Sequence, residues 1–120
     1  MLPIYLDHNA STPLDPQVAA DMKTAIDTLY GNPSSSHWAG RPAKAAVEAA
    51  RTKVATFLGC QPGEVIFTSG GSEANNHAIK GVFFSQRKKG AHLITSRIEH
   101  PATIQPCRFL ETLGAQVTYL

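Results

Sequence analysis

The sequence predicts an α/β fold in which two N-terminal helices precede the start of a parallel sheet with the order β-α-β-α-β. Three short apolar segments carry this prediction, at residues 64–68, 92–95 and 116–119. Each is apolar enough to be buried on both faces, as strands are in a parallel sheet covered by crossover helices. Helical segments separate them, one running to about residue 84 and the next starting after Pro101.

Two helices are expected before the sheet begins. The first starts at Asp15-Pro16, because aspartate is a good N-cap and proline suits the first helical position. The second runs from about Gly40 to Leu58, and Gly59 supplies its C-terminal stop. A short β-prone run at residues 4–6 precedes both helices. Apolar residues at helical spacing predict that each helix buries one face; in the first they are Val18, Met22, Ala25, Ile26 and Leu29, and in the second Val47, Ala50, Val54, Phe57 and Leu58.

Length and composition limit the class of protein. The chain has 120 residues, 42% of them hydrophobic, and a formal net charge of +2, which suits one modest domain and is too short for two. The basic run Arg87–Lys89 stands alone, so no nucleic-acid partner is expected. No apolar stretch is long enough to span a bilayer, so no membrane partner is expected either. Cys60 and Cys107 are not at metal-ligand spacing, and reduced thiols in the cytoplasm are the simplest interpretation.

The turn after the first predicted sheet strand is the most chemical stretch of the sequence. Residues 67–72 read Phe-Thr-Ser-Gly-Gly-Ser, so a strand delivers the chain to two glycines and a helix begins directly afterwards. The free N–H groups and the positive dipole end of such a helix attract phosphate, and the Ser72 hydroxyl adds a donor. The spacing matches neither a dinucleotide fingerprint nor a Walker loop. An ordinary helix start with Ser72 as its cap is the alternative.

A histidine occupies the corresponding position of the next β-α unit. His100 precedes Pro101, which places it at the helix cap and at the carboxyl end of a strand, where ligands collect in open α/β sheets. An imidazole there can stack on a flat ring or move protons near neutral pH. A surface or capping residue is the alternative. The remaining histidines show no ligand spacing and predict no metal site; they are His8, His37, His77 and His92.

Taken together, four ordered motifs resemble one known family. They are Ile4-Tyr5-Leu6-Asp7-His8-Asn9-Ala10-Ser11-Thr12-Pro13, Gly31-Asn32-Pro33-Ser34-Ser35, Val65-Ile66-Phe67-Thr68-Ser69-Gly70-Gly71-Ser72-Glu73 and Glu99-His100. The pattern covers essentially the whole chain and is similar to that of the cysteine desulfurases, within the class V aminotransferase group of fold type I pyridoxal-phosphate enzymes. The resemblance implies one incomplete domain, with an N-terminal segment at 1–60 and the start of the cofactor-binding large domain at 61–120.

The resemblance also implies roles for three residues. Gly71 and Ser72 match the pair that binds the phosphate of pyridoxal 5′-phosphate through backbone N–H and hydroxyl groups. His100 matches the histidine that stacks on the pyridine ring and assists proton transfer. Ser72 stands where many relatives have threonine, and the hydroxyl is retained.

The implied activity is removal of sulfur from L-cysteine, giving L-alanine and an enzyme persulfide for an acceptor such as an iron–sulfur scaffold protein. The family acts as a homodimer and needs a Schiff-base lysine and a loop cysteine that have no match in this chain. An N-terminal fragment that is inactive alone is therefore expected, and the end of the chain within an apparent strand agrees with that expectation. Selenocysteine lyase, another class V aminotransferase and a non-catalytic truncated relative are the alternatives.

Overall fold

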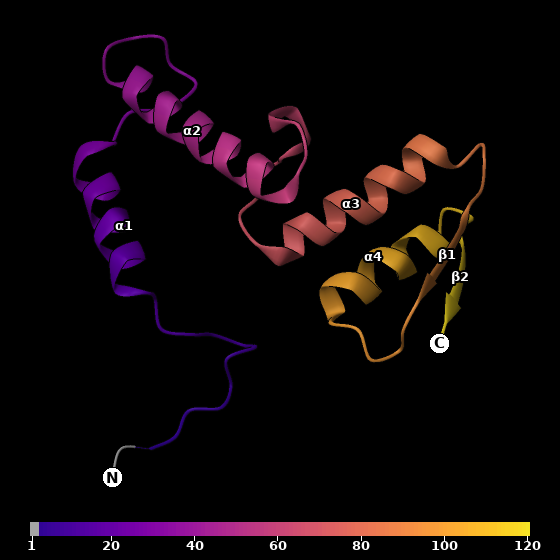
Figure 1. Ribbon diagram of the computed structural model, residues 1–120. Coiled ribbons are helices and arrows are strands. Elements are labelled where there is room, and N and C mark those ends of the chain that lie inside the picture. The colour runs from indigo at the N-terminus through magenta and orange to yellow at the C-terminus, as the bar shows by residue number, and fades with distance from the viewer. Residues whose placement is uncertain (1–2) are drawn as a thin grey trace. The chain divides into compact units, whose positions relative to one another are not determined.

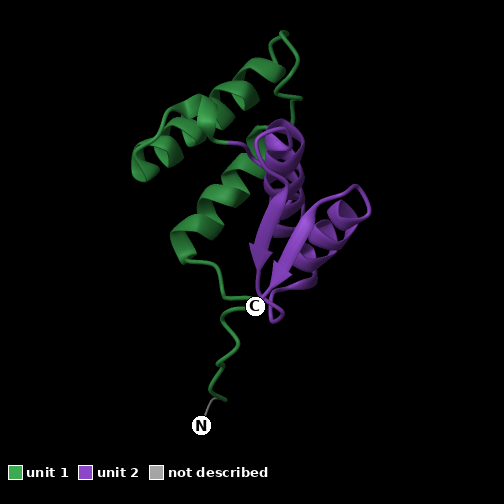
Figure 2. Ribbon diagram, turned by 90° about the vertical axis from the view of Figure 1, so that its right-hand side faces the viewer, with its two compact units in different colours: residues 1–65 green, residues 66–120 purple. Residues whose placement is uncertain are grey.

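A computed structural model describes residues 3–120. The chain forms two compact units, residues 1–65 and residues 66–120, which are coloured separately in Figure 2 and are described one at a time. Within the described residues, no helix is long and apolar enough to cross a membrane.

The first unit contains two helices whose ends follow from capping chemistry (Figure 1). Helix α1 spans Pro16–Thr28, and the Asp15 carboxylate accepts hydrogen bonds from the backbone N–H groups of Gln17 and Val18 at 2.8 and 3.4 Å. Helix α2 spans Gly40–Leu58 and ends at Gly59, whose φ of 68° and ψ of 30° are left-handed and favour glycine. The predicted positions of these helices are confirmed.

A 3-10 turn, η1 (Pro62–Glu64), folds back against α2. The Arg51 guanidinium of α2 donates to the Val65 carbonyl, and the Gln61 backbone N–H donates to the Glu64 carboxylate at 2.7 Å. These bonds hold the chain in place directly after the second helix. Ala43 and Ala55, at 5% and 1% exposed, are the buried apolar residues of α2.

The predicted apolar faces of α1 and α2 are not buried in the structure. Helix α1 has no buried residue, and Ile26 is 75% exposed. In α2, Phe57 is 88% exposed and Leu58 is 64% exposed, while the buried side chains are small alanines. The prediction of burial was wrong for these helices because a spacing of apolar residues indicates a face that can be covered, and no described element of the unit covers it.

The loop between α1 and α2 has a tightly packed glycine. A Cβ at Gly31 would overlap the carbonyl group of Ala39. We therefore expect Gly31→Ala to destabilise the chain by about 1–3 kcal/mol, since the loop backbone must move to make room. Urea unfolding followed by circular dichroism measures this cost. Gly63→Ala is the matched control, because a Cβ there meets nothing within 4 Å, and equal losses in the two variants would contradict the prediction.

The second unit has the order α3 (Gly71–Gln86), β1 (His92–Thr95), α4 (Pro101–Glu111) and β2 (Gln116–Tyr119). The two strands pair in parallel, with His92 opposite Gln116 and Thr95 opposite Tyr119. Both helices lie on one face of this sheet, as Figures 1 and 2 show. Phe83, Cys107 and Leu110 form the core, at 5%, 2% and 0% exposed. The mixed helix and parallel-sheet class is confirmed.

The first strand of the predicted β-α-β-α-β order is absent. Residues 65–68 follow η1 without strand pairing, although Val65 has extended dihedral angles (φ −94°, ψ 121°). The sheet of the described residues contains β1 and β2, so the segment is not one of its strands, and Ile66 is 60% exposed. A strand exists only through its ladder partners, which a local apolar pattern does not supply. The β-prone run at residues 4–6 likewise forms no strand.

Candidate functional site

The N-terminus of α3 is an uncapped helix end. Gly70 occupies the cap position with φ 157° and ψ −179°, a conformation that is essentially restricted to glycine. No side chain caps this helix, and the first backbone bond is Ala74 N–H to the Gly70 carbonyl at 3.0 Å. Ser72 is the second helical residue and Gly70 is the cap, so Ser72 does not cap this helix. The N–H groups of the first turn therefore point out of the helix with its positive dipole end.

The Glu73 side chain holds the turn before this helix. Its Oε2 atom accepts from the Ser69 backbone N–H at 2.7 Å and from the Ser69 hydroxyl at 2.6 Å. These two bonds favour the charged carboxylate and lower the pKa of Glu73, the hydroxyl bond having the larger effect. The carboxylate is thereby directed back toward Ser69. Its acceptor capacity is used within the turn rather than on the N–H groups of Gly71 and Ser72.

The lowered pKa of Glu73 makes a stability prediction. Because the folded pKa lies below the ordinary value, the Ser69–Glu73 contacts stabilise the chain above the ordinary glutamate pKa and are lost as pH falls through the lowered one. In a carbon-13 NMR titration of side-chain carboxyls we expect the Glu73 midpoint to lie below the ordinary glutamate range. Ser69→Ala should raise that midpoint, since it removes the larger cause. An unchanged midpoint in Ser69→Ala would contradict the assignment.

His100 caps helix α4. Its ring Nδ1 accepts from the Ala102 backbone N–H at 3.0 Å, and Pro101 occupies the first helical position. This bond leaves the Nε2 atom to carry the proton of the neutral ring. The capping alternative and the functional one are therefore compatible, since one ring nitrogen fixes the orientation of the ring while its face and the other nitrogen remain available to a ligand.

Ser72 and His100 line one open hollow of about 550 Å³ between α3 and α4. The α3 side contributes Ser72, Asn76 and Lys80, which recur every fourth residue and so share one helix face. The α4 side contributes residues 100–102, 105, 106 and 109. The structure thus brings two of the three predicted site residues together. Gly71 is next to Ser72 at the start of the same helix but is not among the residues that line the hollow.

The residues of the hollow fit pyridoxal 5′-phosphate. The volume is within the range of small-molecule sites. At one end, the uncapped helix start and the Ser72 hydroxyl suit a phosphate, and a Cβ at Gly71 would meet nothing within 4 Å, so space is left for a close approach to its backbone. The imidazole of His100 provides a flat ring on the opposite helix. When bound, this cofactor would supply an electron sink for substrate carbanions.

Sequence reasoning missed Asn76, Lys80 and Phe109 as lining residues of this hollow. The Asn76 amide donates to the Ser72 carbonyl at 2.9 Å, and the Lys80 ammonium lies 4.7 Å from the centre of the Phe109 ring. A lysine over an aromatic face is held by a cation–π interaction and leaves a positive charge beside the hollow. The four-residue spacing from Ser72 could have identified Asn76 and Lys80. Nothing local in the sequence indicates Phe109.

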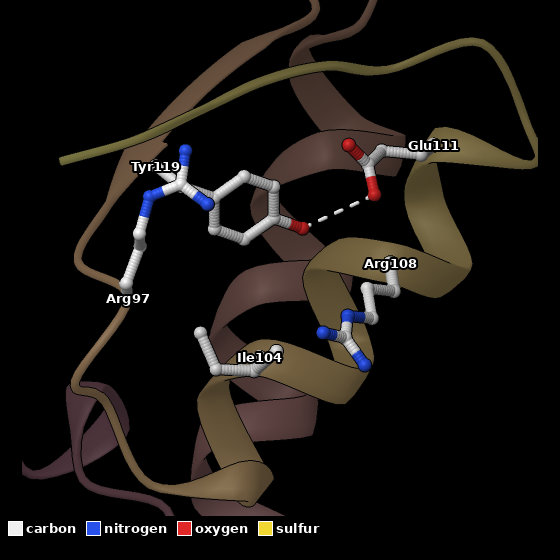
Figure 3. Close-up of a pocket in the computed structure, with 5 residues that line it drawn as sticks. All are labelled: Arg97, Ile104, Arg108, Glu111 and Tyr119. Carbon is white, nitrogen blue, oxygen red and sulfur yellow. Dashed lines mark hydrogen bonds between the residues drawn. The ribbon is translucent and has the colours of Figure 1, made fainter.

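A second, smaller hollow of about 210 Å³ lies against α4 and β2 (Figure 3). It is lined by Arg97, Ile104, Arg108, Glu111 and Tyr119. The Tyr119 hydroxyl donates to the Glu111 carboxylate at 3.1 Å. Desolvation raises the pKa of Tyr119, and the bond to Glu111 raises it further. The phenol therefore stays protonated at neutral pH, and neither Ser72 nor His100 contributes to this hollow.

The N-terminal motif forms a turn within the first unit. The Tyr5 hydroxyl lies 2.9 Å from the Asp7 carbonyl oxygen and 2.9 Å from the Ser11 hydroxyl. His8 Nδ1 is 3.0 Å from the Thr12 hydroxyl, and the two rings of Tyr5 and His8 meet edge to face. The turn is thus held by its own side chains, and it lines a separate hollow of about 400 Å³.

The cysteines have the environments of filler residues. Both are free thiols; Cys60 is half-buried and Cys107 is buried. Desolvation raises the pKa of Cys107, and the nearby Glu111 carboxylate raises it further, which opposes thiolate formation. Within residues 3–120, no group of three or more His, Cys, Asp or Glu side chains could hold a metal ion.

Comparison with known proteins places these features in a family. The model of the class V aminotransferase family matches residues 4–120. The chain is 51% identical over 117 residues to a cysteine desulfurase IscS of Dictyoglomus turgidum, covering 98% of this chain and 30% of that protein. A structure described as SspA in complex with cysteine is similar with a TM-score of 0.80 and 44% identity, covering 92% of this chain and 32% of the other.

A structure described as a NifS-like protein is similar with a TM-score of 0.83 and 38% identity, covering 93% of this chain and 31% of the other. The chain therefore spans about 30% of the length of the curated relatives that it matches. The match of the family model over nearly every residue decides the assignment: the chain belongs to the class V aminotransferase family.

Proposed function

We propose that this chain is the N-terminal part of a pyridoxal-phosphate-dependent cysteine desulfurase, in which it supplies the phosphate-binding and ring-stacking sides of the cofactor site. The observation that carries the proposal is the shared hollow of Ser72 and His100, which lie at the starts of the two successive helices α3 and α4. A cofactor with an anionic group at one end of a flat ring is the ligand class that needs both. Similarity to proteins described as cysteine desulfurase IscS supports the choice of reaction.

Each residue has a defined task in this proposal. Gly71 and Ser72 bind the phosphate through backbone N–H groups and the serine hydroxyl, at the positive end of the α3 dipole. The Ser69–Glu73 contacts keep the preceding turn in the conformation that leaves those donors outward. His100 covers the ring, and the proton on its Nε2 is available for exchange with substrate, while Nδ1 is fixed by the Ala102 N–H.

The substrate, partners and setting belong to the same proposal. L-cysteine is the substrate, supported by the similar structure described as a complex with cysteine. Sulfur passes as a persulfide to an acceptor such as an iron–sulfur scaffold, and the enzyme is a cytoplasmic homodimer. The chain forms one incomplete domain, with an N-terminal segment at 1–60 and the start of the large domain at 61–120. The covalent lysine and the catalytic cysteine lie outside these residues.

Expression of the complete reading frame tests this function. L-cysteine should yield L-alanine and a protein persulfide in equal amounts, and the activity should require added or retained pyridoxal phosphate. The 120-residue chain by itself should show no visible absorbance band of a lysine-bound cofactor. Transamination without sulfur release by the complete enzyme would contradict the reaction. A stoichiometric, borohydride-trapped cofactor on one lysine of the 120-residue chain would contradict the proposal that the covalent lysine lies outside these residues.

A further inference from the structure

We propose that Asn75 and Thr103 form a positioning pair that sets the spacing between Ser72 and His100, so that a single ligand can contact both. The Asn75 amide of α3 donates to the Thr103 hydroxyl of α4 at 3.1 Å, across 28 positions of sequence. Both side chains are half-buried, which limits the competition of water for this bond. The identity of the ligand rests on the proposed function, whereas the spacing role does not.

The Asn75–Thr103 bond joins the two helices close to the residues of the proposed site. Asn75 lies three residues after Ser72 and Thr103 three residues after His100, so each partner is about one turn from a site residue. The Thr103 backbone N–H also donates to the His100 carbonyl at 2.8 Å. Any movement of the bonded pair is therefore transmitted directly to the helix starts that carry the site.

The apolar core lies away from the starts of the two helices, at the end of α3 and in the second half of α4. Phe83 lies in the last turns of α3, and Leu110 lies in the last turn of α4. No residue of α3 before Phe83 and none of α4 before Pro106 is buried, so packing fixes the site ends less firmly than the far ends. A hydrogen bond between the site ends supplies the missing constraint, and it matters for a ligand that bridges the helices rather than for one that contacts α3 alone.

The first arm of the test needs no ligand. In proton–nitrogen NMR spectra of the chain, Thr103→Val should shift the Ser72 amide resonance on the other helix, and Thr103→Ser should restore it. Thr112→Val is the matched control, because its hydroxyl donates to Phe109 within the same helix end at 2.7 Å, and it should leave Ser72 unmoved. If the Ser72 amide resonance does not shift in Thr103→Val, the proposal is overturned, whatever the results of the ligand-binding experiment.

The second arm compares two probes, inorganic phosphate and pyridoxine 5′-phosphate, which has no aldehyde to react with lysines. Thr103→Val should weaken binding of pyridoxine 5′-phosphate by about 3- to 10-fold, the expected loss for one hydrogen bond, and leave phosphate binding unchanged. Equal weakening of both probes overturns the proposal, since it indicates general disorder. A wild-type chain that binds neither probe contradicts the proposed function, while the ligand-free shift of Ser72 would still support the spacing role.

Discussion

The Ser72→Ala variant of the complete enzyme is expected to lose pyridoxal phosphate during dialysis, with a dissociation constant raised about 10- to 100-fold. The hydroxyl is removed from the start of α3, where it lines the hollow, and a hydrogen bond to a charged group contributes about 1.5–3 kcal/mol. His100→Ala should retain more cofactor and instead slow turnover by about 10²- to 10⁴-fold, the usual contribution of a positioned acid or base. Cofactor content by absorbance and alanine release from L-cysteine separate the two effects.

Ser85→Ala is the matched control for the serine variant. Ser85 lies on the same helix but does not line the hollow. Its hydroxyl donates to the Val82 carbonyl at a distance of 3.1 Å. This variant should keep normal cofactor content and turnover. If Ser72→Ala and His100→Ala behaved as this control does, the assignment of the phosphate and ring sides of the site would be wrong.

Leu110→Ala is expected to cost about 2–5 kcal/mol of the free energy of unfolding, the range for truncating a fully buried leucine. Leu110 is 0% exposed and lies in α4, which packs against both α3 and β2. The lost methyl groups leave a cavity in a small core that also contains Phe83 and Cys107, so little surrounding material can relax into it. Urea unfolding monitored by far-ultraviolet circular dichroism measures the change.

Leu113→Ala provides the comparison for that core prediction. Leu113 is three residues further along and 49% exposed, so its truncation should cost less than about 1 kcal/mol. Similar costs for the two leucines would show that the observed core does not support the folded state.

Local chemistry predicted the helix boundaries well. Asp15 before Pro16, Gly59 after Leu58, and His100 before Pro101 each sit at a helix end in the structure. In each case the residue satisfies orphan backbone groups, or adopts the one conformation the end requires, without help from distant parts of the chain. The strands at 92–95 and 116–119 were also predicted, and they pair with each other. The prediction that both of their faces are buried was wrong, since neither strand has a buried residue and the two helices lie on one face of the sheet.

Features that depend on distant partners were predicted poorly. The segment 64–68 has a strand-like composition, yet it forms no ladder in the absence of a neighbouring strand. Ile26 and Phe57 lie on apolar stripes that no described element of their unit covers. For the site, sequence patterns gave Ser72 and His100 separately, whereas Lys80 and Phe109 meet through the packing of α3 on α4.

One titration tests most directly whether the starts of α3 and α4 form a single cofactor site. Pyridoxine 5′-phosphate is added to the isotopically labelled chain, and the amide resonances of Gly71 and Ser72 are followed together with the ring resonances of His100. The predicted result is that all three move along one binding curve with the same midpoint. Movement of Arg97, Arg108 and Tyr119 around the smaller hollow, with Gly71, Ser72 and His100 unchanged, would contradict the assignment.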